Sequence, residues 1–432
     1  MTVRTVPASV GQRLLWLLDR RRGEGGALDE RLAWRIVGPL DVDALQQALD
    51  ALAARHEALR TTFTGSASRL VQVVHSPGHV QFARRDCVTS YRDDHLENLV
   101  NTEFEARTNP ADMPLRVGLW RLDDHDYLLH FSINPLVTDH QSNLKIATDL
   151  GVFYDAFAEG IEPDLPMIEW QYADWAEWQR TSFADGRLTK LQDHWRDVLT
   201  NARPFELPRL TTGAARGEKA YEWRRLGAEV ARSLACVARD YDSSPFAVAL
   251  AAFYVHLYGL TGQDDMVVAS LFANRTRREI RHTVGFFVNL IPLRGTVGPS
   301  HCFAEVLLDT TAMIERATIH QELPYHMLPA KVAAAREVVF QFIDGEPRPT
   351  ALTRLRGLEL TPIERQSNRA RFTLELFVAY ARDHVSPVLL YDRARIDDAW
   401  AESFADGYVR LLRAVAVAPA ATVGALLSSS AR

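Results

Sequence analysis

Residues 134–140, in the order NPLVTDH, place several chemically capable side chains in one short segment. Asp139 offers a carboxylate, and His140 belongs to the residue type that most readily exchanges a proton near neutral pH. Asn134 can donate and accept hydrogen bonds but cannot take up a proton there, and Pro135 has no side-chain donor or acceptor. The segment therefore offers one candidate general base, His140, and one candidate polar contact, Asn134.

The flanking patterns predict that this segment joins a strand to a helix. Residues 127–133 form an apolar run typical of a strand, and residues 141–157 carry an apolar stripe at helical spacing. His130 shares a strand face with Ser132 and Asn134, because side chains alternate with a period of two. We interpret His130 as a packed or hydrogen-bonded histidine. For His140, the alternative to a base is a partly exposed histidine at the start of the helix.

Helical and strand patterns alternate in both halves of the chain, which predicts an α/β protein with two lobes of about 200 residues each. The stretch 161–166 contains two prolines and is the best candidate linker. We therefore predict an N-terminal lobe over residues 1–166 and a C-terminal lobe over residues 167–432.

The composition excludes several classes of function. The 432 residues carry a net charge of −6 without a long basic run, so nucleic acid is not an expected ligand. The longest apolar segment, 245–260, contains a histidine and two tyrosines, which indicates a buried helix and no membrane span. The three cysteines form no CxxC pair, and the N-terminus has no signal-peptide pattern. We therefore expect a cytoplasmic, monomeric protein without a metal site.

Five segments occur in an order that matches one family. They are SVGQRLLWL at 9–17, RHEALRTTF at 55–63, YADWAEWQ at 172–179, NRTR at 274–277 followed by GFFVN at 285–289, and QELPY at 321–325. Together they resemble the condensation domains of nonribosomal peptide synthetases, which have the chloramphenicol-acetyltransferase-like fold. The resemblance implies two such lobes in a V-shaped arrangement, with a tunnel between them.

In that family, a thioester on one carrier protein is attacked by an amine presented on a second carrier protein. The substrates travel on phosphopantetheine arms, so the resemblance implies no bound cofactor. The family signature is H-H-x-x-x-D-G, and its second histidine meets the nucleophile. Here Asn134 and Pro135 replace the two histidines, His140 replaces the glycine, and Asp139 matches. General-base help is typically worth about 10²–10⁴ in rate, and proline cannot supply it.

The resemblance also assigns supporting roles. It implies that Asp139 pairs with Arg275 and holds the loop. Tunnel or lobe contacts are expected from Gln12, Arg60, Trp178, Asn289 and Ile343. Ile343 and Asp344 stand where many relatives have a polar Gln-Asn pair. Arg277, Arg278 and Arg281 are either a solvated face or a contact for an acidic carrier protein.

Three functions remain open from the sequence. The leading hypothesis is condensation-type acyl transfer in nonribosomal peptide biosynthesis, which forms an amide or ester between a carrier-bound acyl group and an acceptor. The alternative is a catalytically inactive relative that binds carrier proteins or recruits a tailoring enzyme. The third is cyclization or other altered chemistry, because Asn134, Asp139 and Ser142 echo the heterocyclization pattern. Expected partners are peptidyl or acyl carrier proteins, neighbouring synthetase modules or a tailoring enzyme, with the chain either stand-alone or part of a larger synthetase.

Overall fold

The computed structural model describes residues 3–22, 30–86, 108–207, 217–329, 336–345, 352, 355–363 and 370–430. The chain divides into two compact units. Unit 1 contains residues 1–187, 273–288 and 348–365, and unit 2 contains residues 188–272, 289–347 and 366–432. The expected boundary between 166 and 167 differs from this division. Two later segments return to unit 1, and helix α5 (Tyr172–Ser182) with the turn Phe183–Arg187 also belongs to it. The sequence also predicts a polar-faced helix over residues 93–106, and this segment lies outside the described residues.

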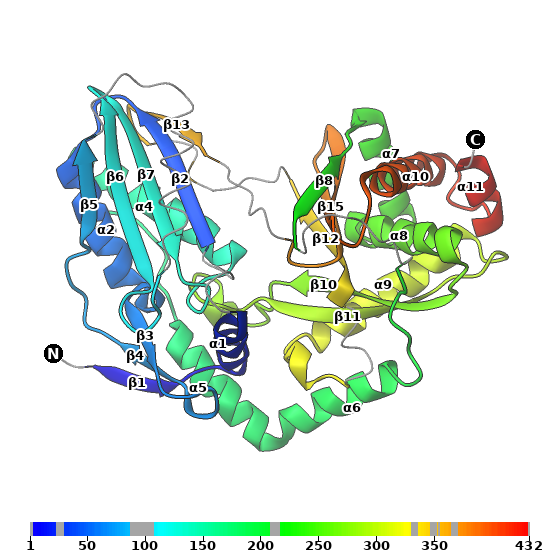
Figure 1. The fold of residues 1–432 in the computed structure, drawn as a ribbon, viewed down its shortest axis with the longest axis horizontal. Helices are drawn as coiled ribbons and strands as arrows, with labels where there is room; N and C mark the ends of the chain where they lie inside the picture. The colour runs from blue at the N-terminus through cyan, green and yellow to red at the C-terminus, as the bar shows by residue number, and fades with distance from the viewer. Residues whose placement is uncertain are drawn as a thin grey trace. The chain divides into compact units, whose positions relative to one another are not determined.

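Unit 1 is built on a five-stranded sheet with the order β13-β2-β7-β6-β5 (Figure 1). Its strands are β2 (Glu30–Val37), β5 (Phe82–Asp86), β6 (Leu115–Asp123), β7 (Asp126–Ile133) and β13 (Glu359–Pro362). Helices α2 (Val42–Arg55) and α4 (His140–Glu159) pack against each other, and their apolar residues join those of the sheet in one core. The edge strand β13 comes from far along the chain and pairs antiparallel with β2.

A second, three-stranded sheet of unit 1 has the order β1-β4-β3, with β1 (Arg4–Pro7), β3 (Thr61–Thr64) and β4 (Val71–Val74). Helices α1 (Val10–Arg22) and α5 (Tyr172–Ser182) also belong to this unit, and short 3-10 turns cover Glu57–Arg60 and Ala67–Arg69. Helix α5 begins with a capping box in which Gln171 and Asp174 bond reciprocally to backbone N–H groups. The irregular turn Phe183–Arg187 ends it, with Gly186 at φ 92°.

The connection from β7 to α4 positions the candidate site. Leu129, Phe131 and Ile133 alternate along β7 and are buried in the unit 1 core. Asp139 is the N-cap of α4, and Gly160 ends the helix in the left-handed conformation. The strand end and the helix start are therefore both fixed by local chemistry, which leaves residues 134–139 as a tight connection between them.

Unit 2 contains a mixed sheet with the order β11-β10-β12-β14-β15-β8, and β9 pairs with β15. The strands are β8 (Lys219–Trp223), β9 (Leu226–Gly227), β10 (Asp265–Phe272), β11 (Asn289–Thr296), β12 (Val338–Asp344), β14 (Leu374–Tyr380) and β15 (His384–Asp392). The helices are α6 (Leu188–Val198), α7 (Ala228–Asp240), α8 (Pro245–Thr261), α9 (Phe303–Ile319), α10 (Asp398–Val417) and α11 (Val423–Ser430). A short 3-10 turn covers Tyr325–Met327 in this unit, and another covers Arg278–Ile280 in unit 1.

Helix α8 is the central helix of unit 2, and it is buried as the sequence predicts. Its residues from Ala247 to Leu257 are all buried, because α9, α10 and the sheet pack around it. Within the described part of the chain, no single helix is long and apolar enough to cross a membrane, and only the bent pair α7 and α8 passes such a test together. The burial of α8 explains this apolar composition by packing.

Candidate functional site

The segment after β7 is a turn built by Asn134 and Pro135. The backbone N–H of Val137 donates to the carbonyl of Asn134 at 3.0 Å, which closes a four-residue turn. The Asn134 Oδ1 accepts from the N–H of Leu136 at 3.1 Å, an Asx turn. Pro135 stands second in the turn, where its fixed φ is favourable. An Asn-Pro pair at this place therefore specifies backbone shape.

Both ends of the Asn134 amide are engaged. Its Nδ2 donates to Thr108 Oγ1 at 3.1 Å while Oδ1 holds the turn, and the residue is buried. The backbone N–H of Asn134 donates to the carbonyl of Pro114 at 2.7 Å. This side chain therefore has a structural role in the loop. The catalytic role expected from the sequence stays a prediction, and the geometry does not support it.

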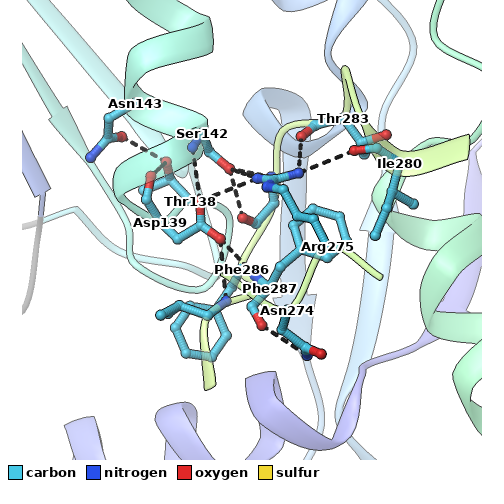
Figure 2. A network of polar contacts seen from close by, with 12 residues as sticks. Thr138, Asp139, Ser142, Asn143, Asn274, Arg275, Ile280, Thr283, Phe286 and Phe287 are labelled. Carbon is cyan, nitrogen blue, oxygen red and sulfur yellow. Dashed lines mark hydrogen bonds and ion pairs between the residues drawn. The ribbon is translucent and has the colours of Figure 1, made fainter. Parts of the chain in front are cut away.

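Asp139 is the centre of a buried hydrogen-bond network (Figure 2). Its Oδ1 accepts from the N–H of Ser142 at 2.8 Å and from Arg275 Nη2 at 3.2 Å. Its Oδ2 accepts from the N–H groups of Phe287 and Val288 at 3.0 and 3.2 Å. The side chain is only 2% exposed. A carboxylate that accepts four bonds is held in place, and its lone pairs are engaged by the protein.

Arg275 completes the network from a distant segment of the chain. Its Nη1 donates to the carbonyls of Ile280 and Thr283, and its Nη2 donates to Asp139 and to Ser142 Oγ (Figure 2). Burial lowers the pKa of this guanidinium, and the Asp139 carboxylate opposes that shift. Because guanidinium remains protonated under ordinary conditions, the pair is a buried salt bridge. The ion pair expected between Asp139 and Arg275 is present.

Ser142 joins the start of α4 to the segment around Gly285. Its Oγ donates to the Gly285 carbonyl at 2.8 Å and accepts from the Gly285 N–H at 3.0 Å. A Cβ on Gly285 would overlap the ring of Tyr172, so only glycine fits there. The glycine of the 285–289 motif is therefore explained by close packing beside the loop.

His140 is the first residue of α4, and its side chain is exposed. All of residues 134–143 are described, and within this segment the hydrogen bonds of the loop do not include the His140 side chain. His130 lies on β7 and is buried, and burial lowers its pKa to about 4. Neither histidine stands in the turn at position 135.

The whole chain matches one family model, the condensation domain, over residues 3–432. The chain belongs to the condensation domain family. This condensation domain is 29% identical over 429 residues to a linear gramicidin synthase of Brevibacillus parabrevis, covering 96% of the chain and 8% of that protein. It is 32% identical over 353 residues to the phosphinothricin tripeptide synthetase PhsB of Streptomyces viridochromogenes, covering 78% of the chain and 29% of PhsB. The domain therefore spans a small part of the curated relatives that it matches.

Solved structures share its fold. The X-domain from teicoplanin biosynthesis superposes with a TM-score of 0.83 at 24% identity, and 97% of each chain is covered. The SgcC5 protein from Streptomyces globisporus gives a TM-score of 0.75 at 25% identity, covering 96% of this domain and 100% of that protein. The expected α/β fold, with lobes of the chloramphenicol-acetyltransferase-like kind, is confirmed.

The structure gives local roles to the other predicted residues of unit 1. Gln12 is fully buried, and its Nε2 donates to the Leu136 carbonyl at 2.8 Å, so it holds the turn of the condensation domain. Arg60 donates to the Ala53 carbonyl at 3.1 Å and lies 3.7 Å from Glu57. Trp178 contacts the Arg277 guanidinium, which lies 4.7 Å from its ring centroid. These contacts are structural, and a tunnel role for them stays a prediction.

Two predicted residues lie in unit 2. Asn289 begins β11, and its Nδ2 donates to the carbonyls of Gln321 and Leu323 at 2.8 and 2.6 Å. Its Oδ1 accepts from the N–H of Tyr325 at 3.2 Å, so it ties the QELPY motif to the strand. Ile343 lies on β12 and is partly exposed. A tunnel position for Ile343 stays a prediction.

The sequence patterns do not indicate the polar residues that support the loop. Thr108 Oγ1 accepts a hydrogen bond from Asn134 Nδ2, and Thr138 Oγ1 donates to Asn143 Oδ1 at 2.7 Å. Gln72 accepts from Gln12 at 3.2 Å. The spacing of Asp139 and Ser142 is visible as a helix N-cap pattern, whereas Thr108 and Gln72 come close only through tertiary pairing. The described residues contain no cluster of three or more potential metal ligands.

Proposed function

We propose that this condensation domain is a binding module of a nonribosomal peptide assembly, which holds a carrier protein or recruits a tailoring enzyme without catalysing condensation. The observation that carries the proposal is Pro135. It stands where the family keeps its working histidine, and the turn around it leaves no protonatable side chain at that point.

The supporting framework of the loop is retained while the base is replaced. Asp139, Arg275 and Ser142 form a buried, closed network, and Gln12 holds the turn. Breaking a buried ion pair costs several kcal/mol of stability. The intact network is therefore what we expect of a domain that needs its fold and its surfaces. The fold of the domain is therefore expected to persist for binding.

A relative with the same fold gives the proposal a concrete form. The X-domain from teicoplanin biosynthesis has been solved in complex with OxyB, and that structure superposes on this domain with a TM-score of 0.84 at 23% identity. We extend from that complex only the idea that a condensation-type fold can serve as a docking platform for another protein.

Acyl transfer without the family's histidine is the second candidate. The intact loop framework favours it, because positioning two bound substrates can supply a large part of a bimolecular acceleration even without a base. An amine is a competent nucleophile once it is deprotonated. In this second function, His140 at the start of α4 is the candidate base.

One assay separates the two functions. The purified domain is incubated with the loaded donor and acceptor carrier proteins of its own assembly, and condensed product is followed by intact mass. Binding of each carrier protein and of the candidate tailoring enzyme is measured in parallel by calorimetry. For a binding module we expect product at the rate of the protein-free control together with measurable binding to one partner. Product above that rate would establish the second function instead, and its loss in His140→Ala would identify His140 as the base.

A further inference from the structure

One face of the unit 2 sheet carries polar residues that neither the motif nor the proposed function uses. Phe340 and Phe342 of β12 contact the ring of Phe246 on α8, with centroids 6.0 and 5.8 Å apart. Gln341 lies between them on the strand, so it points to the opposite face. There its Nε2 donates to Glu375 on β14.

The same face continues across the neighbouring strands. Glu375 lies opposite Leu390 of β15, and Leu390 lies opposite Tyr221 of β8. Lys219 stands two residues before Tyr221, so it shares this face. Tyr221 is more than half exposed. An acid, an amine and apolar side chains are therefore brought together from three strands.

A cavity of about 190 Å³ opens at this place within unit 2. Its lining includes Lys219, Arg371, Phe372, Glu375 and Leu390. Its volume lies below the roughly 300–1,000 Å³ of pockets for drug-sized ligands. The cavity therefore suits a small metabolite.

The Lys219 amine and the Glu375 carboxylate influence one another without closing into contact. Burial raises the pKa of Glu375, while Arg371, Lys219 and the Gln341 hydrogen bond oppose that rise. Burial lowers the pKa of Lys219, and Glu375 opposes that change. Among the residues that the structure describes, the Lys219 amine makes no hydrogen bond or ion pair. A purely structural acid–base pair would be expected to close to contact, because desolvation is offset only at short range.

We propose that this cavity binds a free apolar α-amino acid as a zwitterion, with its ammonium group at Glu375 and its carboxylate at Lys219. The buried Glu375 carboxylate calls for a cation, and the half-buried Lys219 amine calls for an anion. Leu390 and Phe372 supply apolar surface for the side chain. A zwitterion satisfies both charge requirements in one small molecule.

A free amino acid differs from the carrier-bound acceptor that the family resemblance implies. In an aminoacyl thioester the carboxyl carbon is bonded to the carrier's sulfur, so the group carries no negative charge for Lys219 to bind. The site therefore would sense the unloaded amino acid. Its existence does not depend on the proposed function, because it contains none of the residues around Asp139.

Calorimetric titration of the full domain tests this proposal. The probes are L-leucine and L-phenylalanine, with two leucine analogues that each lack one charge, 4-methylpentanoate and 3-methylbutylamine. We expect at least one of the two amino acids to bind, and for leucine we expect both analogues to bind at least about tenfold more weakly. Equal binding of 4-methylpentanoate would overturn the zwitterion in favour of a simple anion site. Absence of binding by both amino acids would overturn the site itself.

Variants connect any binding to the cavity. Glu375→Gln keeps the acceptor for Gln341 but removes the charge, and Lys219→Met removes the amine. Each should weaken amino acid binding at least about tenfold, with an unchanged circular dichroism spectrum showing that the fold is kept. Lys190→Met changes an exposed lysine of α6 in the same unit and should leave binding unchanged. Wild-type affinity in Glu375→Gln would place the ligand elsewhere.

Discussion

At the scale of residues, the side chains that fix the shape of the loop in this condensation domain are different from the side chain that could act as a base. Asp139 accepts four hydrogen bonds and pairs with Arg275, while Pro135 contributes only its backbone preference. His140 is left exposed at the start of α4. The residues that shape the loop are therefore engaged with one another, and the candidate base lies outside the turn.

Replacing Asp139 with alanine should destabilise the domain strongly. The change leaves the Arg275 guanidinium buried beside Ser142 without its counter-charge, which typically costs about 3–5 kcal/mol of unfolding free energy. Urea denaturation followed by circular dichroism measures this. Asp193→Ala removes an exposed carboxylate that pairs with Arg196 on α6 and should cost less than about 1 kcal/mol. Equal effects of the two changes would contradict a structural role for Asp139.

Replacing His140 with alanine should leave both stability and any acyl transfer unchanged. Its side chain is exposed, so its removal opens no cavity, and surface changes usually stay within about 0.5 kcal/mol. Thermal unfolding and the intact-mass assay are the two readouts. A loss of product of about 10²-fold or more without a change in stability would instead identify His140 as the base.

At the scale of elements, local sequence signals specify more of the structure than the pairing between distant segments. The helix from Asp41, the β6–β7 hairpin and α4 are all predictable, because caps and periodicity lie within each segment. The pairing of β13 with β2 and the return of residues 273–288 to unit 1 are not predictable, since nothing local encodes a partner more than a hundred residues away. The Asp139–Arg275 contact follows from family resemblance rather than from spacing.

The Asn-Pro turn between β7 and α4 should lose stability when its proline is replaced. Pro135→Ala leaves the turn hydrogen bonds in place but gives the unfolded chain more freedom, which typically costs about 0.4–1 kcal/mol. Chemical denaturation measures the change. An increase in stability would show that Pro135 is strained in the turn.

Helix α8 should make unit 2 sensitive to acid through His256. This side chain packs against Phe404, with ring centroids 4.5 Å apart, and burial lowers its pKa from 6.5 to about 4. The unfolded state binds a proton at this histidine below about pH 6.5, whereas the folded state does so only near pH 4. The free energy of unfolding therefore has its full value above about pH 6.5 and decreases as the pH falls towards 4. The shift corresponds to a contribution on the order of 3 kcal/mol.

Comparing His256→Leu with the wild-type domain isolates this effect. Unfolding free energies at several pH values between 4 and 7 should fall less steeply in the variant, since it has no proton to take up at this position. His79→Leu serves as the control, because His79 is exposed on unit 1. Equal pH slopes of wild type and His256→Leu would contradict the assignment.

At the scale of the whole molecule, the condensation domain fold is established, and the open question is what that fold is used for. The family model covers nearly all of the chain, while the curated relatives are far longer. The net charge of −6 gives no sign of a polyanionic partner. We therefore propose a protein partner within a biosynthetic assembly, with Pro135 where the family resemblance places the histidine.

The most direct test of the binding role is the intact-mass condensation assay with cognate loaded carrier proteins, run beside a protein-free control. We predict no product above the control rate in the wild-type domain or in His140→Ala, although the domain binds a carrier protein or tailoring enzyme. Wild-type product formed at least about tenfold faster than in the control would contradict the binding role and would show that the fold still catalyses condensation with Pro135 in place of the histidine.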